Sequence, residues 1–432
     1  MSNSFSTSKI NTGFDYFIVF LIIFYAGKAT IFVQAIEDWQ PIIGLLLPVA
    51  AFTAYGFFKN VYFNHRFWLL LIGYTLYFIA STIKFEELHP RFFMINIIYI
   101  TMAYVAIAGM RYRFFKIYED FLYILSIIAI VFWVLLNIAP ETVTETFSIL
   151  EFSGQEGPES KIAYNFIVYT VNDYQEIPQY ILNFGGIQVF RNSGFAWEPG
   201  AFAVYVNIAI FANIVRNRFK LTNKFRLTVL IFALITTFST TGYMMLVLLL
   251  FFYLYNQDLK TMFWVAPLVL TAVIYLFTLP FMAEKIANNM EFNTKELVYN
   301  SLKHNAKYQP QRFESLQIDF IDFLNHPIIG YGGHQEARWT NQMGAQISTV
   351  SGIGKIMAQY GLVGTLFFII SLWKSSKRII SVFNYQRGNF PGVVYITNIN
   401  KLWALHRLIH VHLAVLSAKF QEVRSYKRIF QT

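Results

Sequence analysis

Two polar segments carry arginine, histidine and glutamate directly beside apolar stretches. The first reads RNSGFAWEP, from Arg191 to Pro199. An arginine at the centre of a bilayer costs about 2.5 to 3.5 kcal/mol, so a cation next to hydrocarbon needs a polar partner. Guanidinium grips phosphate with paired hydrogen bonds, and Pro199 suits the first turn of a helix whose free N–H groups attract anions. Arg191 is therefore a candidate anion-binding residue, with pairing to Glu198 or to nearby acidic residues as the alternative.

The second segment reads QPQRFESLQIDFIDFLNHPIIGYGGHQEARW. Its apolar residues recur on a helical period from Arg312 to Leu324, which predicts an amphipathic helix. After His326, a glycine-rich turn presents His334, and Arg338 follows. A histidine can act as a general base near pH 7, and an arginine beside it can hold an anion. A surface histidine without a role is the alternative, and no histidine pair in this segment has the spacing of a zinc site, so we expect no metal.

The composition predicts which kind of structure positions these two segments. Hydrophobic residues make up 56% of the 432 residues and charged residues 13%, whereas soluble domains are about 25% charged. We expect an all-α, polytopic transmembrane bundle, because apolar runs near the ~20 residues of a membrane span recur along the chain. Cysteine is absent, which excludes disulfides and thiolate sites. Ten spans are expected: Tyr16–Ala35, Pro41–Phe58, Phe67–Ile83, Phe92–Met110, Phe121–Ala139, Pro199–Val215, Leu227–Phe238, Tyr243–Tyr255, Thr261–Met282 and Gly352–Trp373.

Basic residues indicate the orientation of the bundle. They gather in the connections on the side that holds the N-terminus, which the positive-inside rule makes cytoplasmic. Two long connections, 140–198 and 283–351, face the opposite side and are long enough to have a function. The first is acidic between Pro140 and Phe190, with seven carboxylates against Lys161, so nucleic acid is not an expected partner. The basic residues are Lys59, Arg66, Arg111, Arg113, Lys116, Arg216, Arg218, Lys220, Lys224, Arg226, Lys374, Lys377 and Arg378.

The chain divides into a membrane domain, residues 1–383, and a basic cytoplasmic tail, residues 384–432. The tail contains KLWALHRLIHVHLAVLSAKF, whose charges and histidines prevent it from crossing the bilayer. It is expected to lie on an anionic lipid surface as an amphipathic helix, or to be a solvated helix without a site.

A third element, STVSGIGKIMAQYGLVG, opens the last expected span with small residues that allow close helix packing. With RNSGFAWEP, the hairpin TTFSTTGYMMLVLLL and the segment HPIIGYGG, it makes the chain resemble the O-antigen ligase and O-antigen polymerase superfamily. The resemblance covers roughly residues 16–373. These enzymes handle undecaprenyl-pyrophosphate-linked glycans at the outer face of the bacterial inner membrane.

The resemblance implies a fold similar to the C-type glycosyltransferases and no metal or other cofactor. It implies transfer of a glycan from undecaprenyl pyrophosphate to an acceptor hydroxyl, in contact with membrane lipids and with a chain-length regulator protein as a further partner. Arg191 matches the arginine that holds the pyrophosphate, and Arg312 matches the basic residue that opens the outer helix.

Two departures favour a repeat-unit polymerase, for O-antigen or exopolysaccharide, over a ligase that caps lipid A core in lipopolysaccharide. Ligases usually show a His-Asn pair before the last helix, where this chain has Val350 and Ser351, and an acidic residue where it has Gln359. They also tend to carry arginine in the turn that here reads Ser239, Thr240 and Thr241. The family commonly adds spans after this point, so the C-terminus is expected to be truncated or altered.

In the expected mechanism, Arg191, Arg312 and Arg338 bind the pyrophosphate, and the base is His334, His326 or Glu198, in that order. The main rival is a flippase for lipid-linked oligosaccharide. Transporters place charges in mid-membrane and often have two related halves, but no repeat is visible here and only Lys28 and Lys355 lie inside spans.

Overall fold

A computed structural model gives a mostly helical protein. Met1–Ser376 forms one compact unit, and the second unit, Lys377–Thr432, is described only as far as Tyr385. The structure describes residues 3–26, 41–111, 113–147, 150–153, 161–164, 169–171, 181–184, 187–196, 198–255, 267, 271, 298–299, 301–303, 310, 312–345, 347–349 and 351–385.

Five helices in the described part of the chain are long and apolar enough to cross a membrane. They are α4 (His65–Phe85), α5 (Pro90–Met110), α6 (Arg113–Ile138), α8 (Pro199–Arg216) and the first part of α16 (Gly352–Tyr385). Shorter apolar helices are Thr12–Phe24 in α1 (Asn3–Leu21) with the π-helical turn Ile22–Ala26, Leu46–Phe58 in α3 (Pro41–Phe58), and Thr240–Phe251 in α10 (Thr240–Tyr255). With α9 (Lys224–Thr236), these helices match nine expected spans in position. The tenth, Thr261–Met282, falls almost wholly outside the described residues, as does the tail, so ten spans stay a prediction.

One end of the helix bundle gathers basic residues around buried acids. Asp15 of α1 is 1% exposed and pairs with Lys59 at 2.8 Å and with Arg113 at 3.2 Å, while the hydroxyl of Tyr55 donates to it at 2.6 Å. These partners come from two different connections. The middle of α1, the end of α3 and the start of α6 therefore lie together.

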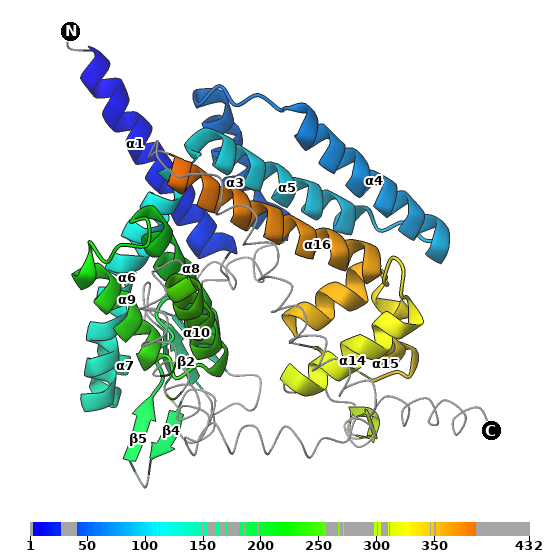
Figure 1. Ribbon diagram of the computed structural model, residues 1–432. Coiled ribbons are helices and arrows are strands. Elements are labelled where there is room, and N and C mark those ends of the chain that lie inside the picture. The colour runs from blue at the N-terminus through cyan, green and yellow to red at the C-terminus, as the bar shows by residue number, and fades with distance from the viewer. Residues whose placement is uncertain are drawn as a thin grey trace. The chain divides into compact units, whose positions relative to one another are not determined.

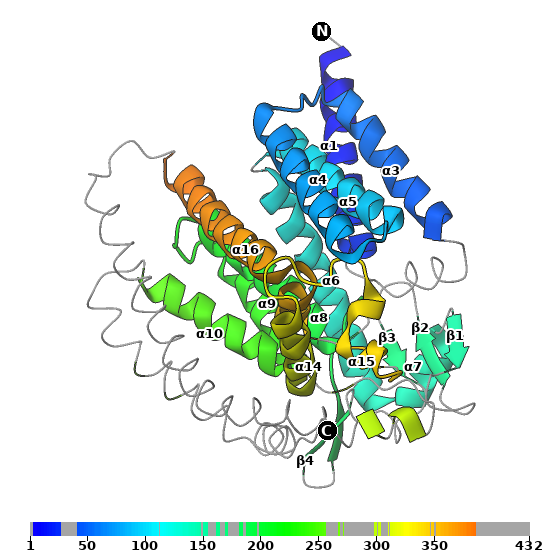
Figure 2. The same cartoon turned by 90° about the vertical axis from the view of Figure 1, so that its right-hand side faces the viewer.

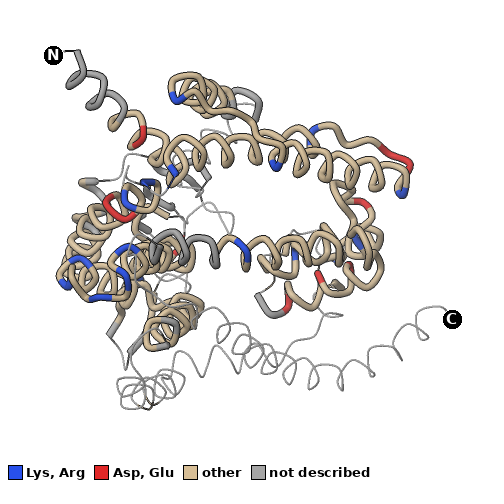
Figure 3. Tube along the Cα trace, turned by 45° about the horizontal axis from the view of Figure 1, so that its top comes forward, with Lys and Arg blue, Asp and Glu red and all other residues tan. Residues whose placement is uncertain are grey.

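A second charged group lies at the start of α6. Glu119 is buried and pairs with Arg216, Asp120 pairs with Arg226, and Asn213 donates to Glu119 at 2.7 Å. Tyr16 of α1 also donates to Asp120, at 3.1 Å. Basic residues of three expected cytoplasmic connections thus lie at one end of the bundle, near Asp15 and Tyr16 of α1 (Figure 3).

The opposite end joins α6, α8 and α9. Trp133 Nε1 of α6 donates to the carbonyl of Phe190 at 2.6 Å, and the Phe190 N–H donates to Asn137 at 2.9 Å. Asn192 N–H donates to the carbonyl of Thr236, the last residue of α9, at 2.9 Å. Helices α6 and α8 therefore run in opposite directions, and so do α8 and α9.

The first long connection is not wholly helical. It begins with α7 (Pro140–Phe147) and continues in two small antiparallel sheets, one of β1 (Leu150–Ser153), β2 (Lys161–Tyr164) and β3 (Tyr169–Val171), the other of β4 (Ile181–Phe184) and β5 (Ile187–Phe190). In β4–β5, Ile181 pairs with Phe190 and Phe184 with Ile187. These strands depart from the helical architecture expected for the chain, although the membrane part is helical.

Helix α8 packs against three other helices, α6, α9 and α10 (Figures 1 and 2). Its buried face carries Phe202, Val206 and Ile210. A Cβ on Gly242 of α10 would lie 2.6 Å from Cβ of Ala203, and Asn207 Nδ2 donates to the Gly242 carbonyl at 3.0 Å. This close approach fixes α8 against α10, and α8 begins at the segment that contains Arg191.

Helix α16 is interrupted at Gly361, whose φ of 63° is not helical. The second long connection supplies new partners for the interrupted backbone: Tyr331 N–H donates to the Ala358 carbonyl at 3.0 Å, and Val363 N–H to the Ile328 carbonyl at 3.1 Å. Only glycine fits here, because a Cβ would lie 2.4 Å from the Ile328 oxygen. The motifs HPIIGYGG and MAQYGLVG therefore form one interlocked unit.

Candidate functional site

Arg191 lies against the C-terminal end of α9. Its Nε donates to the Thr237 carbonyl at 3.1 Å and its Nη2 to the Phe238 carbonyl at 3.0 Å. These carbonyls lie just past the last turn of a helix, where the backbone acceptors have no helical donor and the dipole favours a cation. The positive charge of Arg191 is thus stabilised by two backbone carbonyl oxygens.

The rest of the first segment is built around Asn192. Its side chain donates to Thr236 Oγ1 at 3.0 Å and accepts from the N–H of Gly194, also at 3.0 Å. Gly194 has φ of 52°, and a Cβ there would collide with the Phe202 ring at 2.7 Å. The N-cap of α8 is Glu198, half-buried, with Pro199 in the first turn as expected. Arg191 and Glu198 therefore lie where the end of α9 meets the start of α8.

The second segment docks on α4. The amphipathic helix is α14 (Arg312–Asn325), with the expected start and an end one residue beyond that expected. The following turn contacts α4 through Tyr77, whose hydroxyl donates to the Ile329 carbonyl at 2.9 Å, and through Lys84, whose Nζ donates to the Gly330 carbonyl at 3.0 Å. The break in α16 and the C-terminal half of α4 together hold this turn.

Four ionisable side chains meet where the second segment touches the α4–α5 hairpin. His334 Nδ1 lies 3.4 Å from Glu336 Oε1 and 3.9 Å from Glu87 Oε2. His89 Nε2 lies 3.3 Å from the same oxygen of Glu336 and 3.7 Å from that of Glu87. One ligand atom from each of the four residues falls within 4.8 Å of the others. These four residues, called the hairpin cluster below, could hold a metal ion.

The two candidate histidines differ in their surroundings. His334 is 3% exposed and packs on the rings of Phe85 and His89; burial lowers its pKa, and His89 acts in the same direction. His326 also contacts Phe85. Burial lowers the pKa of His326, and Lys84 lowers it further, whereas the hydrogen bond to Ala337 raises it. His326 Nε2 lies 3.2 Å from the Ala337 carbonyl oxygen. Because a carbonyl only accepts, Nε2 carries the proton and Nδ1 of the neutral ring is an acceptor.

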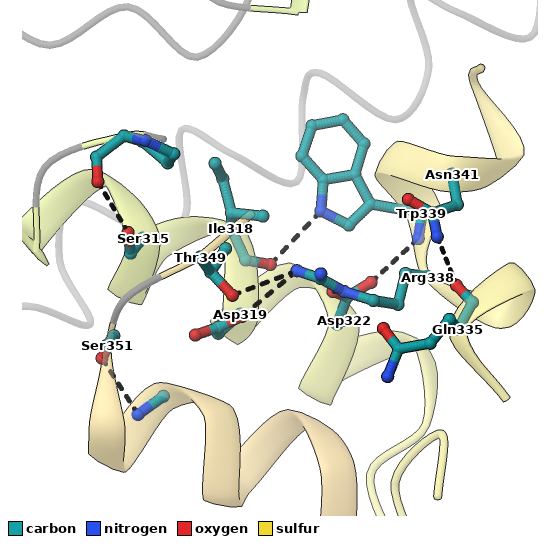
Figure 4. Close-up of polar contacts among 12 residues, drawn as sticks. Ser315, Ile318, Asp319, Asp322, Gln335, Arg338, Trp339, Asn341, Thr349 and Ser351 are labelled. Atoms are coloured by element: carbon teal, nitrogen blue, oxygen red, sulfur yellow. Dashed lines mark hydrogen bonds and ion pairs between the residues drawn. The ribbon is translucent and has the colours of Figure 1, made fainter. Parts of the chain in front are cut away.

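Arg338 lies in a buried network with α14 (Figure 4). Its Nε donates to Asp322 at 3.0 Å and its Nη2 lies 3.4 Å from Asp319, while the Trp339 N–H donates to Asp322 at 2.8 Å. Thr349 accepts from Nη2 at 3.3 Å. Arg338 thus pairs with two buried carboxylates, and it joins α14 to α15 (Trp339–Gln342) and to Thr349 before α16.

The carboxylates of this network are not equally satisfied. Asp319 Oδ2 is buried and makes no hydrogen bond, and a Cβ on Gly354 of α16 would lie 2.9 Å from it. Burial raises the pKa of Asp319 from 3.8 to about 6, against the lowering effects of Thr349 and Arg338. Burial also raises the pKa of Asp322.

The structure brings some of the expected site residues together. His326, His334 and Arg338 share the turn after α14, and Arg191 and Glu198 share the junction of α8 and α9. The side chain of Arg312 lies outside the described part, so its convergence with Arg191 stays a prediction. Arg338 contacts two aspartates, and no described contact links it to Arg191.

Sequence reasoning missed four ionisable residues. Glu87 and His89 lie in the short turn between two spans, and their partners follow about 250 residues later, so spacing gives no signal. Asp319 and Asp322 lie on the polar face of the predicted amphipathic helix, which the pattern assigns to water. The structure buries this face instead, with Ser315, Ile318, Asp319 and Asp322.

Comparisons with known protein families, curated proteins and solved structures found no match. The described helices define a class: the chain is a helical, multi-pass membrane protein. The resemblance to the O-antigen ligase and polymerase superfamily stays a prediction from its motifs.

Proposed function

We propose that the protein is a repeat-unit polymerase for O-antigen or exopolysaccharide in the bacterial inner membrane. It transfers a glycan from undecaprenyl pyrophosphate to a hydroxyl of an acceptor repeat unit at the outer face. The end of the bundle that carries α1 and the basic connections faces the cytoplasm, which leaves the junction of α8 and α9 and the α4–α5 hairpin on the outer side.

The observation that carries the proposal is the position of the ionisable groups. In the described helices, Asp, Glu, Lys and Arg are absent from 67–83, 92–110, 121–138, 199–215 and 356–373. The candidate bases and cations lie instead at helix ends and in the polar connection that docks on them. A polymerase needs this arrangement, because its lipid pyrophosphate and its sugar hydroxyl meet at the boundary of membrane and water.

We assign the role of general base to His326 rather than His334. The bond from Nε2 to the Ala337 carbonyl orients the ring, and Nδ1 is the acceptor. The acceptor hydroxyl attacks the anomeric carbon of the donor sugar and gives its proton to Nδ1. The bond from the anomeric carbon to the phosphate oxygen breaks, and the pyrophosphate leaves with the electron pair.

The leaving pyrophosphate needs cations and N–H donors. Arg191 is proposed for this role, together with Arg312 and the N-terminus of α8 at Pro199. In this proposal Arg191 holds the end of α9 and the donor lipid with one guanidinium group, which delivers hydrogen bonds in several directions. Arg338 acts indirectly, by holding the turn that carries His326.

The test uses purified protein in lipid nanodiscs with synthetic undecaprenyl-pyrophosphate-linked repeat units. The wild-type protein should lengthen them, and His326→Gln should slow elongation by about 100-fold to 10,000-fold, the usual contribution of a general base. His65→Gln is the matched control, because His65 is exposed at the opposite end of α4. Elongation by His326→Gln at the wild-type rate would remove His326 from the mechanism, and no elongation by the wild type would refute the polymerase.

The break in α16 favours a second candidate, a flippase for the same lipid-linked oligosaccharide. Interrupted membrane helices often form the binding sites of transporters, and α16 is interrupted at Gly361. The same nanodisc substrates, placed in vesicles, separate the candidates: a flippase moves the repeat unit between leaflets at unchanged length. A ligase would transfer the glycan to added lipid A core instead.

A further inference from the structure

The spacing of the hairpin cluster is that of a metal coordination sphere. Zn²⁺ binds histidine nitrogen and carboxylate oxygen at about 2.0 to 2.2 Å, which places tetrahedral ligand atoms about 3.3 to 3.6 Å apart. The four ligand-to-ligand distances between a histidine nitrogen and a glutamate oxygen are 3.3, 3.4, 3.7 and 3.9 Å. The two remaining separations, between the two nitrogens and between the two oxygens, are at most 4.8 Å, so the side chains must move inward to coordinate one ion.

His334 gives a second, independent indication. Its side chain is 4% exposed, and its Nδ1 is a buried polar atom without a hydrogen bond. That atom is directed at the carboxylates of Glu87 and Glu336. A buried polar atom without a hydrogen bond is costly, and a cation placed among the four side chains would satisfy it.

We propose that Glu87, His89, His334 and Glu336 bind one divalent transition-metal ion, with Zn²⁺ as the best match. Two imidazoles favour Zn²⁺ and its neighbours over Mg²⁺ and Ca²⁺, which take oxygen ligands. The two carboxylates neutralise the charge of the ion. Four protein ligands close a tetrahedral site, which is typical of a structural metal rather than a catalytic one.

The bound ion would join the α4–α5 hairpin to the turn before α15. Glu87 and His89 lie between α4 and α5, while His334 and Glu336 flank the start of the 3-10 turn Gln335–Ala337. The glutamates are 57% and 59% exposed, so an ion can enter from the water side. The site holds the segment that carries His326, but it does not depend on glycan transfer.

The test measures Zn²⁺ binding to the full chain in nanodiscs after removal of metal with a chelator. Equilibrium dialysis with elemental analysis should find one tightly bound Zn²⁺ per chain. His89→Gln and Glu336→Gln change partly exposed side chains and should leave the fold intact. Each should weaken binding by at least about 100-fold, because changes outside the ligand set already cost 10-fold to 100-fold.

A second site is the main competing explanation, because the tail carries His406, His410 and His412. A variant with all three replaced by Gln is the matched control and should bind like the wild type. Substitution with Co²⁺ should give the intense visible absorption of tetrahedral coordination, lost in His89→Gln. Absence of tight binding by the wild type, or binding that survives His89→Gln and disappears in the tail variant, would overturn the proposal. None of these measurements uses glycan transfer, so the polymerase and the metal site fail independently.

Discussion

The buried network around Arg338 predicts an unusual pH dependence, which Asp319→Asn should abolish. Asp319 is fully buried, its Oδ2 makes no hydrogen bond, and Arg338 shares its charge with Asp322. Its ionised form is therefore less favourable in the folded protein than in the unfolded chain. The protonated form is favoured by folding, so the folded state binds more protons at mildly acidic pH.

The sign and the size follow from the pKa. Burial raises the pKa of Asp319 from 3.8 to about 6, which corresponds to about 3 kcal/mol between full protonation and full ionisation. Stability of this region should be highest below pH 4, fall as the pH rises from about 4 to about 6, and stay low above that. Between pH 4 and pH 7 the expected loss is about 2 kcal/mol, or roughly 30-fold in the local opening equilibrium.

Hydrogen exchange read by mass spectrometry measures this loss in peptides that cover α14. Exchange rates are corrected for the intrinsic effect of pH, and protection is compared at pH 4 and pH 7 for the wild type and Asp319→Asn. Because other carboxylates also titrate, the difference between the two proteins is the measured quantity. Asparagine cannot ionise, so the variant should be more protected than the wild type at pH 7 relative to pH 4.

Asp322→Asn is the matched control. Asp322 receives Arg338 Nε and the Trp339 N–H, so its replacement breaks paired contacts and should reduce protection at pH 7. An identical pH profile in Asp319→Asn and the wild type would refute the account of Asp319.

Three further substitutions test the packing. Gly361→Ala should lower the free energy of unfolding by at least about 2 kcal/mol, because φ is 63° and the new Cβ would collide with the backbone. Gly352→Ala is the control and should be neutral, because nothing lies within 4 Å of its Cβ position. Hydrogen exchange of the docked turn measures both. Arg191→Met should lose about 1.5 to 3 kcal/mol in thermal unfolding, because charge-assisted bonds to two carbonyls disappear. Gly109→Ala should cost about 1 to 3 kcal/mol, because its Cβ would lie 2.5 Å from a tyrosine ring, and Gly73→Ala is the control without neighbours; thermal unfolding in detergent measures the pair.

The helices could be predicted because hydrophobicity and capping are local. Pro41–Phe58 was expected with the bounds that the structure has, and α8 and α14 begin at the expected Pro199 and Arg312. The strands of the first long connection were not expected. Their segments are only three or four residues long, too short for an alternating pattern to be distinguished in a polar stretch.

The site was harder to predict, because its contacts join residues far apart in the chain. His334 and His326 were recognised as candidates, but nothing near them in sequence indicates His89 as a neighbour. Gly361 was part of a recognised motif, but the sequence did not show why glycine is required there: the backbone of Ile328, from another segment, approaches too closely for a Cβ. Arg191 was recognised by its charge, whereas two of its partners are backbone carbonyls, a group that every residue has.

The interruption of α16 also constrains how the protein is made. Backbone groups released at Gly361 find their partners in the preceding connection, and hydrocarbon offers none. This connection precedes α16 in the chain, so it is synthesised first. Formation of the interrupted membrane helix therefore requires the docked turn, because a chain without it would leave backbone groups near Gly361 unpaired in hydrocarbon.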